Sequence, residues 1–322
     1  MNEVSFIPVQ TVTEASRLLK ERTPSEAVPM AGGTDLLIQK RQKLIVPRTI
    51  VYLKSIPVLS EIRPEESGGL SIGAMATLDE VAHHPGVKGK YPMLAQAAFS
   101  VASPQIRHKA TIGGNICLNS RCWFYNRSPF WRAEYPECRK ASGGRQCYVV
   151  PGSRRGCFAL QSGDVVGPLV ALGATLRVIS DGGERILSID GLYLGDGIRY
   201  LSLEPGEILT EIFLPPPSGT GLFFKFRPQN NLDFATFTLS VLLPRNEEGS
   251  RIVVASVASR PLRAGKAERM LDQEAWDAEA VARKASEELK LVSFVRGAVE
   301  FKKQAIQAKL SDLLKSLRGR SL

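Results

Sequence analysis

The chain contains little histidine, and this scarcity limits the chemistry open to it. Of its 322 residues only His83, His84 and His108 are histidines. The chain therefore offers few histidines from which a Ser-His-Asp triad or a histidine-rich metal site could be built. No apolar run approaches 18 residues, so no membrane-spanning helix is expected. A hydrophobic content of 43% and a charged content of 23% are typical of a globular protein, and the length predicts two or three domains.

The start of the sequence lacks the charged and apolar regions of a secretory signal. Met1-Asn2-Glu3-Val4 runs straight into a strand-like segment. We therefore expect a cytoplasmic protein, in which stable disulfides are rare.

Four of the five cysteines lie within 36 residues, with the spacing Cys122-x15-Cys138-x8-Cys147-x9-Cys157. Four thiolates hold a cubane iron–sulfur cluster or a structural zinc ion, and the third alternative is a set of inert cysteines. The close C-x2-4-C pairs usual for zinc are missing, and the spacing is not that of a standard ferredoxin either. Spacing alone favours a cluster and leaves the other two alternatives open. The fifth cysteine, Cys117, lies in an apolar setting and is expected to be a small buried hydrophobe.

Positive charge is concentrated around the cysteines. The net charge of the chain is +10. Residues 118–158 contain eight basic and two acidic side chains, so 8 − 2 = +6 of that charge lies within 41 residues. Four explanations are open: nucleic-acid binding, since aromatic residues interleave with the arginines; docking of an acidic redox partner; compensation of an anionic thiolate-ligated cluster; and a solvated surface loop.

Apolar stretches and capping signals divide the chain into three parts. Residues 1–55 predict a small β-α-β unit with strands at 4–6, 27–30 and 50–53 and a helix that starts at the capping-box spacing of Thr11 and Glu14. Residues 56–215 predict a second part that carries the cysteine loop as an insertion at about 118–158. Its expected elements are strands at 59–62, 70–73, 184–189 and 208–214, a short helix after Thr77 and a helix at 93–102.

Residues 216–322 predict a C-terminal α+β domain. Its clearest boundary signal is the linker-like run Pro215-Pro216-Pro217-Ser218-Gly219. Alternating or apolar stretches at 222–226, 237–243 and 252–257 predict a three-stranded antiparallel sheet. The pattern from Arg263 onward is helical, and its helical spacing includes Leu289, Val292, Val295 and Val299.

Two glycine-rich turns are candidate phosphate sites. They read Ala31-Gly32-Gly33-Thr34-Asp35 and Ala110-Thr111-Ile112-Gly113-Gly114-Asn115. Neither is a G-x-G-x-x-G motif and no Walker lysine follows, so each alone is more often a plain tight turn. Two such turns in one domain favour a pyrophosphate site, because each offers backbone N–H groups with no Cβ in the way. Thr34 and Thr111 add hydroxyl groups, and Asn115 adds an amide.

An ordered set of motifs resembles the FAD-binding subunits of molybdenum hydroxylases, the flavoproteins of xanthine dehydrogenase and carbon monoxide dehydrogenase. The set covers nearly the whole chain and comprises segments 31–36, 72–74, 106–116, 163–164, 169–174, 205–209, 225–227, 233–235 and 260–264. The resemblance implies an α+β fold, with a two-part FAD-binding domain of the vanillyl-alcohol-oxidase (PCMH) type and a C-terminal domain of three-stranded antiparallel sheet and helices. One departure is His108, where the family usually has asparagine.

Most members of this family lack the cysteine loop. A four-cysteine insertion directly after the second glycine turn resembles the β subunit of 4-hydroxybenzoyl-CoA reductase. That resemblance implies an additional [4Fe–4S] cluster with Cys122, Cys138, Cys147 and Cys157 as its ligands, and it moves the balance away from zinc.

The resemblance also implies a set of FAD-binding residues and no catalytic residue on this chain. The set is Ala31, Gly32, Gly33, Thr34, Asp35, Leu36, Gly73, Thr111, Gly113, Gly114, Asn115, Asp164, Leu209 and Lys225. The two glycine turns should hold the pyrophosphate, and Asp164 should bond the ribityl or nearby hydroxyls. Leu209 and Lys225 should approach the isoalloxazine, where the charge of Lys225 can stabilise anionic reduced flavin. The plainer alternatives are a turn cap for Asp164 and a surface position for Lys225.

The resemblance implies an electron-relaying subunit with its substrate pocket on another chain. The complex, expected as a dimer of heterotrimers, would include a molybdenum-cofactor subunit and a [2Fe–2S] subunit, and would convert 4-hydroxybenzoyl-CoA to benzoyl-CoA. Electrons would come from a ferredoxin-type donor through the [4Fe–4S] cluster and FAD. Two alternatives remain: the flavin subunit of another molybdenum hydroxylase, for purines or N-heteroaromatics, and an iron–sulfur nucleic-acid-binding protein. Neither a membrane nor a nucleic-acid partner is expected for the preferred function.

Overall fold

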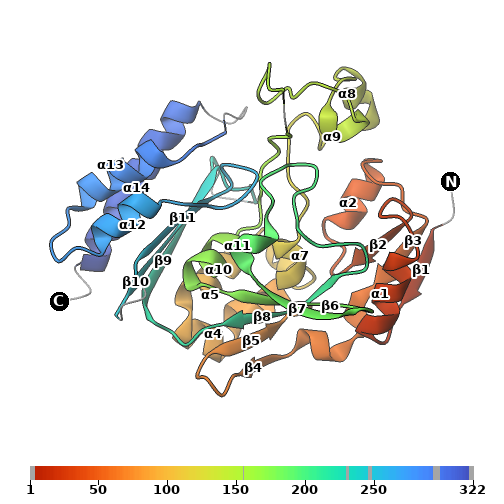
Figure 1. The fold of residues 1–322 in the computed structure, drawn as a ribbon, viewed down its shortest axis with the longest axis horizontal. Coiled ribbons are helices and arrows are strands. Elements are labelled where there is room, and N and C mark those ends of the chain that lie inside the picture. The colour runs from red at the N-terminus through yellow and green to blue at the C-terminus, as the bar shows by residue number, and fades with distance from the viewer. Residues whose placement is uncertain (1–3, 155, 230–231, 246–248, 293–297, 319–322) are drawn as a thin grey trace.

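The computed structural model describes residues 4–154, 156–229, 232–245, 249–292 and 298–318. These residues form three sheets, whose helices and strands are drawn in Figure 1. Two large hydrophobic clusters hold them together, one across residues 9–253 and one formed only by residues 237–317. None of the described helices combines the length and apolar character needed to cross a membrane.

The first sheet is parallel and has the strand order β1-β3-β2. Its strands are β1 (Ser5–Pro8), β2 (Ala27–Met30) and β3 (Thr49–Tyr52), and helices α1 (Val12–Lys20) and α2 (Leu36–Arg41) connect them. Helix α1 begins after Thr11, whose hydroxyl oxygen accepts the amide hydrogen of Glu14 over 3.1 Å. The elements predicted for residues 1–55 are therefore present, and α2 follows directly on the first glycine turn.

The second sheet has five antiparallel strands in the order β4-β5-β8-β6-β7. They are β4 (Ile62–Pro64), β5 (Leu70–Gly73), β6 (Thr175–Ser180), β7 (Gly183–Ser188) and β8 (Ile208–Leu214). The strand predicted at 59–62 is wrong, because two 3-10 turns, η1 (Leu53–Ser55) and η2 (Pro57–Ser60), precede β4. Pro57 fixes φ at the first position of η2 and favours the turn over an extended chain.

Short helices occur between the strands of the second sheet, and one of them contains the second glycine turn. They are α3 (Leu78–His83), α4 (Pro85–Lys90), α5 (Pro92–Phe99), α6 (Pro104–Arg107), α7 (Ile112–Ile116), α10 (Val166–Leu172) and α11 (Ile189–Leu192). The predicted capping box is present at Thr77 and Glu80. The helix predicted at 93–102 ends at Phe99, before Ala102 takes a φ of 40°.

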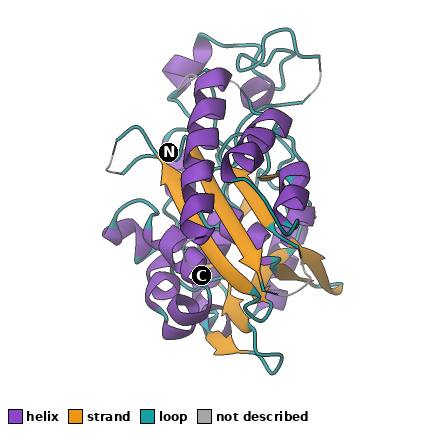
Figure 2. Ribbon diagram, turned by 90° about the vertical axis from the view of Figure 1, so that its left-hand side faces the viewer, coloured by secondary structure: helices purple, strands orange, loops and turns teal. Residues whose placement is uncertain are grey.

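The C-terminal sheet has four strands rather than the predicted three. Its order is β12-β11-β10-β9, formed by β9 (Gly219–Phe226), β10 (Phe237–Pro244), β11 (Arg251–Ala255) and β12 (Leu262–Arg263). Strand β12 has two residues, too few to show a period in the sequence. Helices α12 (Gly265–Leu271), α13 (Ala278–Glu288) and α14 (Val299–Arg318) cover one face of this sheet (Figure 2), and α10 packs on the other.

Alternation along β10 explains these two faces. Phe237, Leu239 and Val241 belong to the cluster formed with the C-terminal helices, whereas Leu242 belongs to the larger cluster. The helical spacing predicted across 289–299 is interrupted, because α13 ends at Glu288 and α14 begins at Val299. Val295 lies outside the described residues.

The cysteine loop projects from the body of the fold, at the top of Figure 1. Arg121 and Leu160 close its neck, since each donates its amide hydrogen to the carbonyl of the other over 2.7 Å. Helices α8 (Pro129–Ala133) and α9 (Arg139–Ser142) lie inside the loop. The neck residues 121 and 160 lie a few residues from the ends given for the insertion, about 118–158, which stays a prediction.

Candidate functional site

The two glycine turns lie against each other. A Cβ built at Gly32 would stand 1.9 Å from the carbonyl oxygen of Lys109, so the first turn touches the backbone that enters the second. A Cβ at Gly114 would stand 3.7 Å from the Cβ of Ala31. Segments 80 residues apart in the sequence are thus joined at one place, as a shared phosphate site requires.

The first turn carries a row of amides without a partner. Within the described residues, no hydrogen bond is donated by the amides of Gly32, Gly33, Thr34, Asp35 or Leu36. Gly33 has a φ of 73°, which only glycine adopts easily. Unpaired N–H groups in such a turn attract an anion. Of the two turns, the first is therefore the stronger candidate for a phosphate-binding site.

The second turn uses its own amides internally. The hydroxyl oxygen of Thr111 accepts the amide hydrogen of Gly114 over 3.0 Å, and the amides of Gly113 and Asn115 donate to the carbonyls of Ala74 and Thr111. Thr111 is buried and caps α7 through its hydroxyl oxygen, which accepts an amide hydrogen and leaves the O–H able to donate. The second turn thus supports the first by packing.

Gly73 and Leu209 lie on strands β5 and β8 of the second sheet. A Cβ at Gly73 would stand 2.2 Å from the carbonyl oxygen of Leu59, so close backbone packing explains this glycine. Leu209 is buried on β8. Contact of either residue with a cofactor stays a prediction.

Asp164 and Lys225 form a buried ion pair. Lys225 on β9 donates to Asp164 Oδ2 over 2.6 Å and to the carbonyl of Ser100 over 3.1 Å. Their side chains are 6% and 7% exposed, so the surface position considered for Lys225 is wrong. Burial raises the pKa of Asp164, against the charge of Lys225.

The second carboxylate oxygen of Asp164 gives the clearest indication of a ligand-binding site. Asp164 Oδ1 is buried and has no hydrogen-bond partner among the described residues. A buried acceptor without a partner costs about 1–3 kcal/mol. Asn115 Oδ1 accepts the amide hydrogen of the neighbouring Val165 over 3.2 Å, which ties this carboxylate to the second turn. A hydroxyl-bearing phosphate ester such as FAD fits both the free amides and this acceptor.

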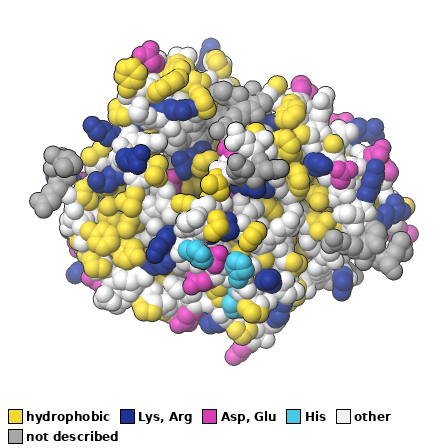
Figure 3. Space-filling view, turned by 180° about the vertical axis from the view of Figure 1, so that it is seen from behind, with side chains coloured by type: hydrophobic (Ala, Val, Ile, Leu, Met, Phe, Trp, Pro, Cys, Tyr) yellow, Lys and Arg dark blue, Asp and Glu magenta, His cyan; other side chains and the backbone are white. Residues whose placement is uncertain are grey.

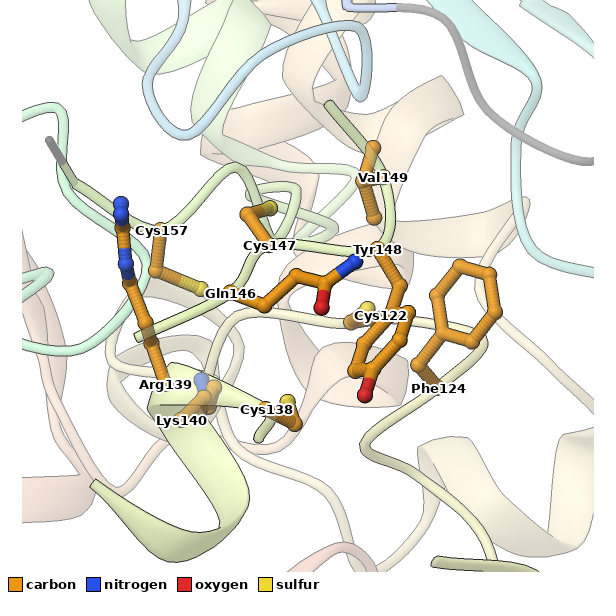
Figure 4. Close-up of a pocket in the computed structure, with 10 residues that line it drawn as sticks. All are labelled: Cys122, Phe124, Cys138, Arg139, Lys140, Gln146, Cys147, Tyr148, Val149 and Cys157. Carbon is orange, nitrogen blue, oxygen red and sulfur yellow. The ribbon is translucent and has the colours of Figure 1, made fainter. Parts of the chain in front are cut away.

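All four clustered cysteines line one pocket (Figure 4), and Cys117 does not. Their thiols are free and each residue is 6–7% exposed. Burial raises the pKa of Cys122 to about 11 and of Cys117 to about 12. Within the described residues, no three ligating side chains are arranged as a ready site for a single metal ion. The case for a metal group therefore rests on four thiols that share one pocket.

The loop fixes these cysteines through backbone contacts. The amide of Cys122 donates to Asn126 Oδ1 over 2.8 Å, and the amide of Cys157 donates to Asp196 Oδ2 over 2.9 Å. Cys138 forms an isolated bridge with Gln146. Asp196 is 39 residues from Cys157, and no signal in the sequence pointed to it.

Two cations stand beside the thiols in the same pocket. Arg139 donates to the carbonyls of Arg145, Ser153 and Gly156 over 2.6–2.9 Å and so ties the loop together. Lys140 points back into the fold. Burial lowers the pKa of Lys140 to about 8, and the nearby Cys157 and Cys122 oppose that shift. Lys140 is therefore turned away from solvent, and docking of an acidic partner by this loop stays a prediction.

Helix α2 connects the first glycine turn to the cysteine loop. Arg121 pairs with Asp35 at the start of α2, and Asn119 Nδ2 donates to Gln39 Oε1 over 3.0 Å. Arg132 donates to the carbonyls of residues 42 and 43 over 3.1 and 2.9 Å. The loop thus holds both ends of the helix that follows the first turn.

The aromatic residues of the loop pack largely on one another. The guanidinium of Arg127 lies 3.5 Å from the ring centre of Trp123, and Phe124 contacts Tyr135 and Tyr148. These contacts explain their presence without a stacked base. Phe130 and Trp131 are exposed, at 80% and 45%.

The histidines lie at the surface, on the face shown in Figure 3. His83 Nδ1 and His108 Nδ1 stand 3.5 and 3.3 Å from Asp79 Oδ2. His108, which replaces the usual asparagine of the family, is therefore occupied with Asp79 rather than with the glycine turns.

Comparisons with known proteins agree with this geometry. Residues 2–217 match the family described as "FAD binding domain in molybdopterin dehydrogenase", and residues 223–317 match "CO dehydrogenase flavoprotein C-terminal domain". The FAD-binding subunit of an Escherichia coli aldehyde oxidoreductase is 28% identical over 281 residues, which is 85% of this chain and 87% of that protein. The carbon monoxide dehydrogenase medium chain of Afipia carboxidovorans is 29% identical over 83% of this chain and 79% of its own.

Solved structures share the fold across the whole chain. A chain of the carbon monoxide dehydrogenase of Hydrogenophaga pseudoflava superposes with a TM-score of 0.79 and 24% identity, covering 99% of this chain and 98% of that one. A chain of the quinoline 2-oxidoreductase of Pseudomonas putida 86 gives 0.76 and 22%, covering 98% and 97%. The predicted α+β fold class is thereby confirmed.

Proposed function

Because this chain belongs to the family of FAD-binding subunits of molybdenum hydroxylases, of the carbon monoxide and xanthine dehydrogenase type, we propose that it is the flavin and iron–sulfur electron-transfer subunit of a molybdenum-containing reductase. The observation that carries the flavin part is the row of five free amides at 32–36, and the unpartnered Asp164 Oδ1, which the second turn ties to the same part of the fold, supports it. FAD, when bound, supplies one- and two-electron transfer.

The residues of the chain divide the work of holding FAD. The amides of the first turn, from Gly32 to Leu36, would bind the pyrophosphate together with the second turn, from Thr111 to Asn115, which packs against the first. Asp164 Oδ1 accepts a ribityl or neighbouring hydroxyl. Lys225 keeps a positive charge beside the ring system, where it favours an anionic reduced flavin.

We further propose that Cys122, Cys138, Cys147 and Cys157 hold a [4Fe–4S] cluster. The support is that four free thiols from one insertion share one pocket, and that thiolates are the usual ligands of such clusters. Thiols must lose their protons to bind metal, so assembly releases protons. A zinc ion is the competing occupant of four thiolates, and metal analysis separates the two.

The proposed reaction of the complex is the reductive removal of a phenolic hydroxyl. 4-Hydroxybenzoyl-CoA takes up two electrons and two protons and yields benzoyl-CoA and water. A ferredoxin-type donor supplies the electrons, and the proposed partners are a molybdenum-cofactor subunit and a [2Fe–2S] subunit in a cytoplasmic dimer of heterotrimers. The names of the relatives, which are FAD subunits and medium chains, support a multi-subunit complex.

A second candidate is the flavin subunit of a different molybdenum hydroxylase. The relatives act by name on an aldehyde, nicotinate or carbon monoxide, and the substrate pocket of the proposed complex is expected on another chain. The cysteine loop favours the first candidate. Turnover by the purified complex with 4-hydroxybenzoyl-CoA, against nicotinate and xanthine, decides between them.

Anaerobic purification followed by flavin and metal analysis tests the cofactors. We expect about one FAD, about four iron atoms and no zinc per chain, the content of one cubane. Cys→Ala at each of the four proposed ligands should lose iron, whereas Cys117→Ala, the matched control, should keep it. Zinc in place of iron would overturn the cluster, and salt-dependent DNA binding without flavin would favour the nucleic-acid alternative.

A further inference from the structure

Lys140 has more contacts than its place in a surface loop explains. Its Nζ donates to Asn119 Oδ1 and to the carbonyl of Gly197 over 2.7 Å, and to the carbonyl of Ser120 over 3.0 Å. It also contacts Ser120 Oγ. The side chain as a whole is only partly buried, but its ammonium is enclosed by these oxygens. It lines the same pocket as the four cysteines (Figure 4).

The acceptors around Nζ select the charged form of this lysine. The two backbone carbonyls can only accept hydrogen bonds. Asn119 also presents its oxygen, because its Nδ2 donates to Gln39 Oε1 over 3.0 Å. Three accepting oxygens use all three donors of an ammonium, and a neutral amine has only two. The rings of Tyr125 and Tyr200, with centres 4.8 and 5.6 Å from Nζ, add further attraction for a cation.

We propose that Lys140 is an internal cation that raises the reduction potential of the iron–sulfur cluster, a role that rests on the cluster proposed above. The pocket would bring four thiolate charges together, and reduction adds one more negative charge. A fixed positive charge beside the thiols favours the reduced state. Cluster potentials depend on such charge, on hydrogen bonds and on exposure to solvent.

Lys140 differs in this respect from the other cations of the loop. Arg145 and Arg154 are exposed, so water and salt screen their fields. Arg139 donates its hydrogen bonds to loop carbonyls, and two of these three hydrogen bonds are exposed to solvent. Of the two described cations that line the cysteine pocket, Lys140 is the one whose donors all go to acceptors away from solvent, and its effect should therefore persist in high salt.

Potentiometric titration of the anaerobic protein, followed by visible absorption and electron paramagnetic resonance, measures this effect directly. Lys140→Gln keeps a polar side chain but removes the charge. We expect the variant to hold about four iron atoms and to favour the reduced cluster at least tenfold less, which is 59 mV for a one-electron couple. Lys140→Arg, which keeps the charge, should stay within threefold of the wild-type equilibrium. Arg145→Gln is the control for loss of a nearby exposed charge and should change it less than threefold.

Asn119→Asp gives an independent test that leaves Lys140 in place. It sets a carboxylate against Nζ and should shift the equilibrium in the same direction as Lys140→Gln, so it decides the question if Lys140→Gln loses iron. An unchanged potential in the iron-loaded variants would overturn the role of Lys140 alone. A shift that disappears in 1 M salt would assign it to surface charge and also overturn that role. Wild-type protein without iron would overturn the cluster itself, and Lys140 with it.

Discussion

Lys225 Nζ donates a 2.6 Å hydrogen bond to Asp164 Oδ2, and the pair joins the C-terminal sheet to the segment that precedes α10. The side chains on the same face of β9 point toward the larger hydrophobic cluster, as buried Phe223 shows. The ion pair therefore connects the two hydrophobic units at the proposed flavin site. Its free oxygen, Asp164 Oδ1, stays available for a ligand.

Removal of Lys225 should cost both stability and flavin. Lys225→Met leaves a buried carboxylate without its partner, so we expect a loss of about 3–5 kcal/mol in the free energy of unfolding and a reduced FAD content. Urea unfolding and the flavin absorbance of the purified protein measure the two effects. The matched control is Lys20→Met, whose pair with Asp181 is 3.0 Å long but largely exposed, with an expected change of ~1 kcal/mol or less. Equal losses in both variants would contradict this account.

The same variant should have a stronger pH dependence of stability than the wild type, with a known sign. Burial raises the pKa of Asp164 above its ordinary 3.8, and Lys225 opposes the shift. Without Lys225 the folded state holds this proton more tightly than the unfolded state. Its stability therefore falls as the pH rises above the unfolded pKa, by up to about 1.4 kcal/mol per pH unit, until the folded pKa is passed. Unfolding of Lys225→Met between pH 5 and 8 tests this, and Asp164→Asn/Lys225→Met should lose the dependence.

Gly114 offers a cleaner test of the flavin site than its neighbours. Gly114→Val places methyl groups between the two turns, where the nearest atoms to a Cβ are Thr111 Oγ1 at 3.0 Å and the Cβ of Ala31 at 3.7 Å. We expect a folded protein with little FAD, seen as a normal circular dichroism spectrum and a low flavin absorbance. Gly89→Val, on a helix with open space around it, should keep its FAD. Gly32→Ala is unsuitable because its Cβ would collide with a backbone carbonyl 1.9 Å away.

Local motifs predicted much of the fold and part of the site. Strands 27–30, 70–73 and 208–214 were predicted with the bounds that the structure gives them, because alternation and turn residues mark them plainly. The cysteines were recognised as a set because they lie within one insertion. Their shared pocket is consistent with that grouping.

Pairings across long stretches of sequence could not be predicted in the same way. Lys225 meets Asp164 from 61 residues away, and Lys140 meets Gly197 from 57 residues away. Nothing in a linear pattern distinguishes these lysines from surface lysines. The function of the +6 charge of the loop could not be predicted for the same reason, because composition does not show whether a cation faces solvent or a backbone carbonyl.

The attachment of the cysteine loop to α2 should influence FAD binding. Arg132→Met removes the bonds to the carbonyls of residues 42 and 43, each worth about 1.5–3 kcal/mol when the donor is charged and buried, and less in this partly exposed position. We expect faster proteolysis within 118–158 and a several-fold faster loss of FAD on dilution. Arg154→Met, an exposed residue of the same loop, should change neither rate. Intact FAD retention with a proteolysed loop would show that the two sites are independent.

Docking of an acidic electron donor should depend on Arg145 and Arg154, the two basic residues that are exposed among the described residues of the loop. Arg139 and Lys140 are occupied inside the loop, so their reversal would damage the pocket itself, whereas Arg145 and Arg154 face solvent. Attraction between opposite surfaces raises association rates and is screened over about 8 Å at physiological ionic strength.

Arg145→Glu/Arg154→Glu should therefore slow reduction by a ferredoxin roughly tenfold at low salt, a change at the lower end of electrostatic steering. At high salt the same variant should differ little from the wild type. Lys88→Glu/Lys290→Glu changes the net charge equally at exposed positions outside the loop and should have a smaller effect. Stopped-flow reduction across an ionic-strength series measures all three proteins, and dithionite serves as a small donor that needs no docking. Parallel salt dependence in the two double variants would mean that net charge, not this loop, attracts the donor.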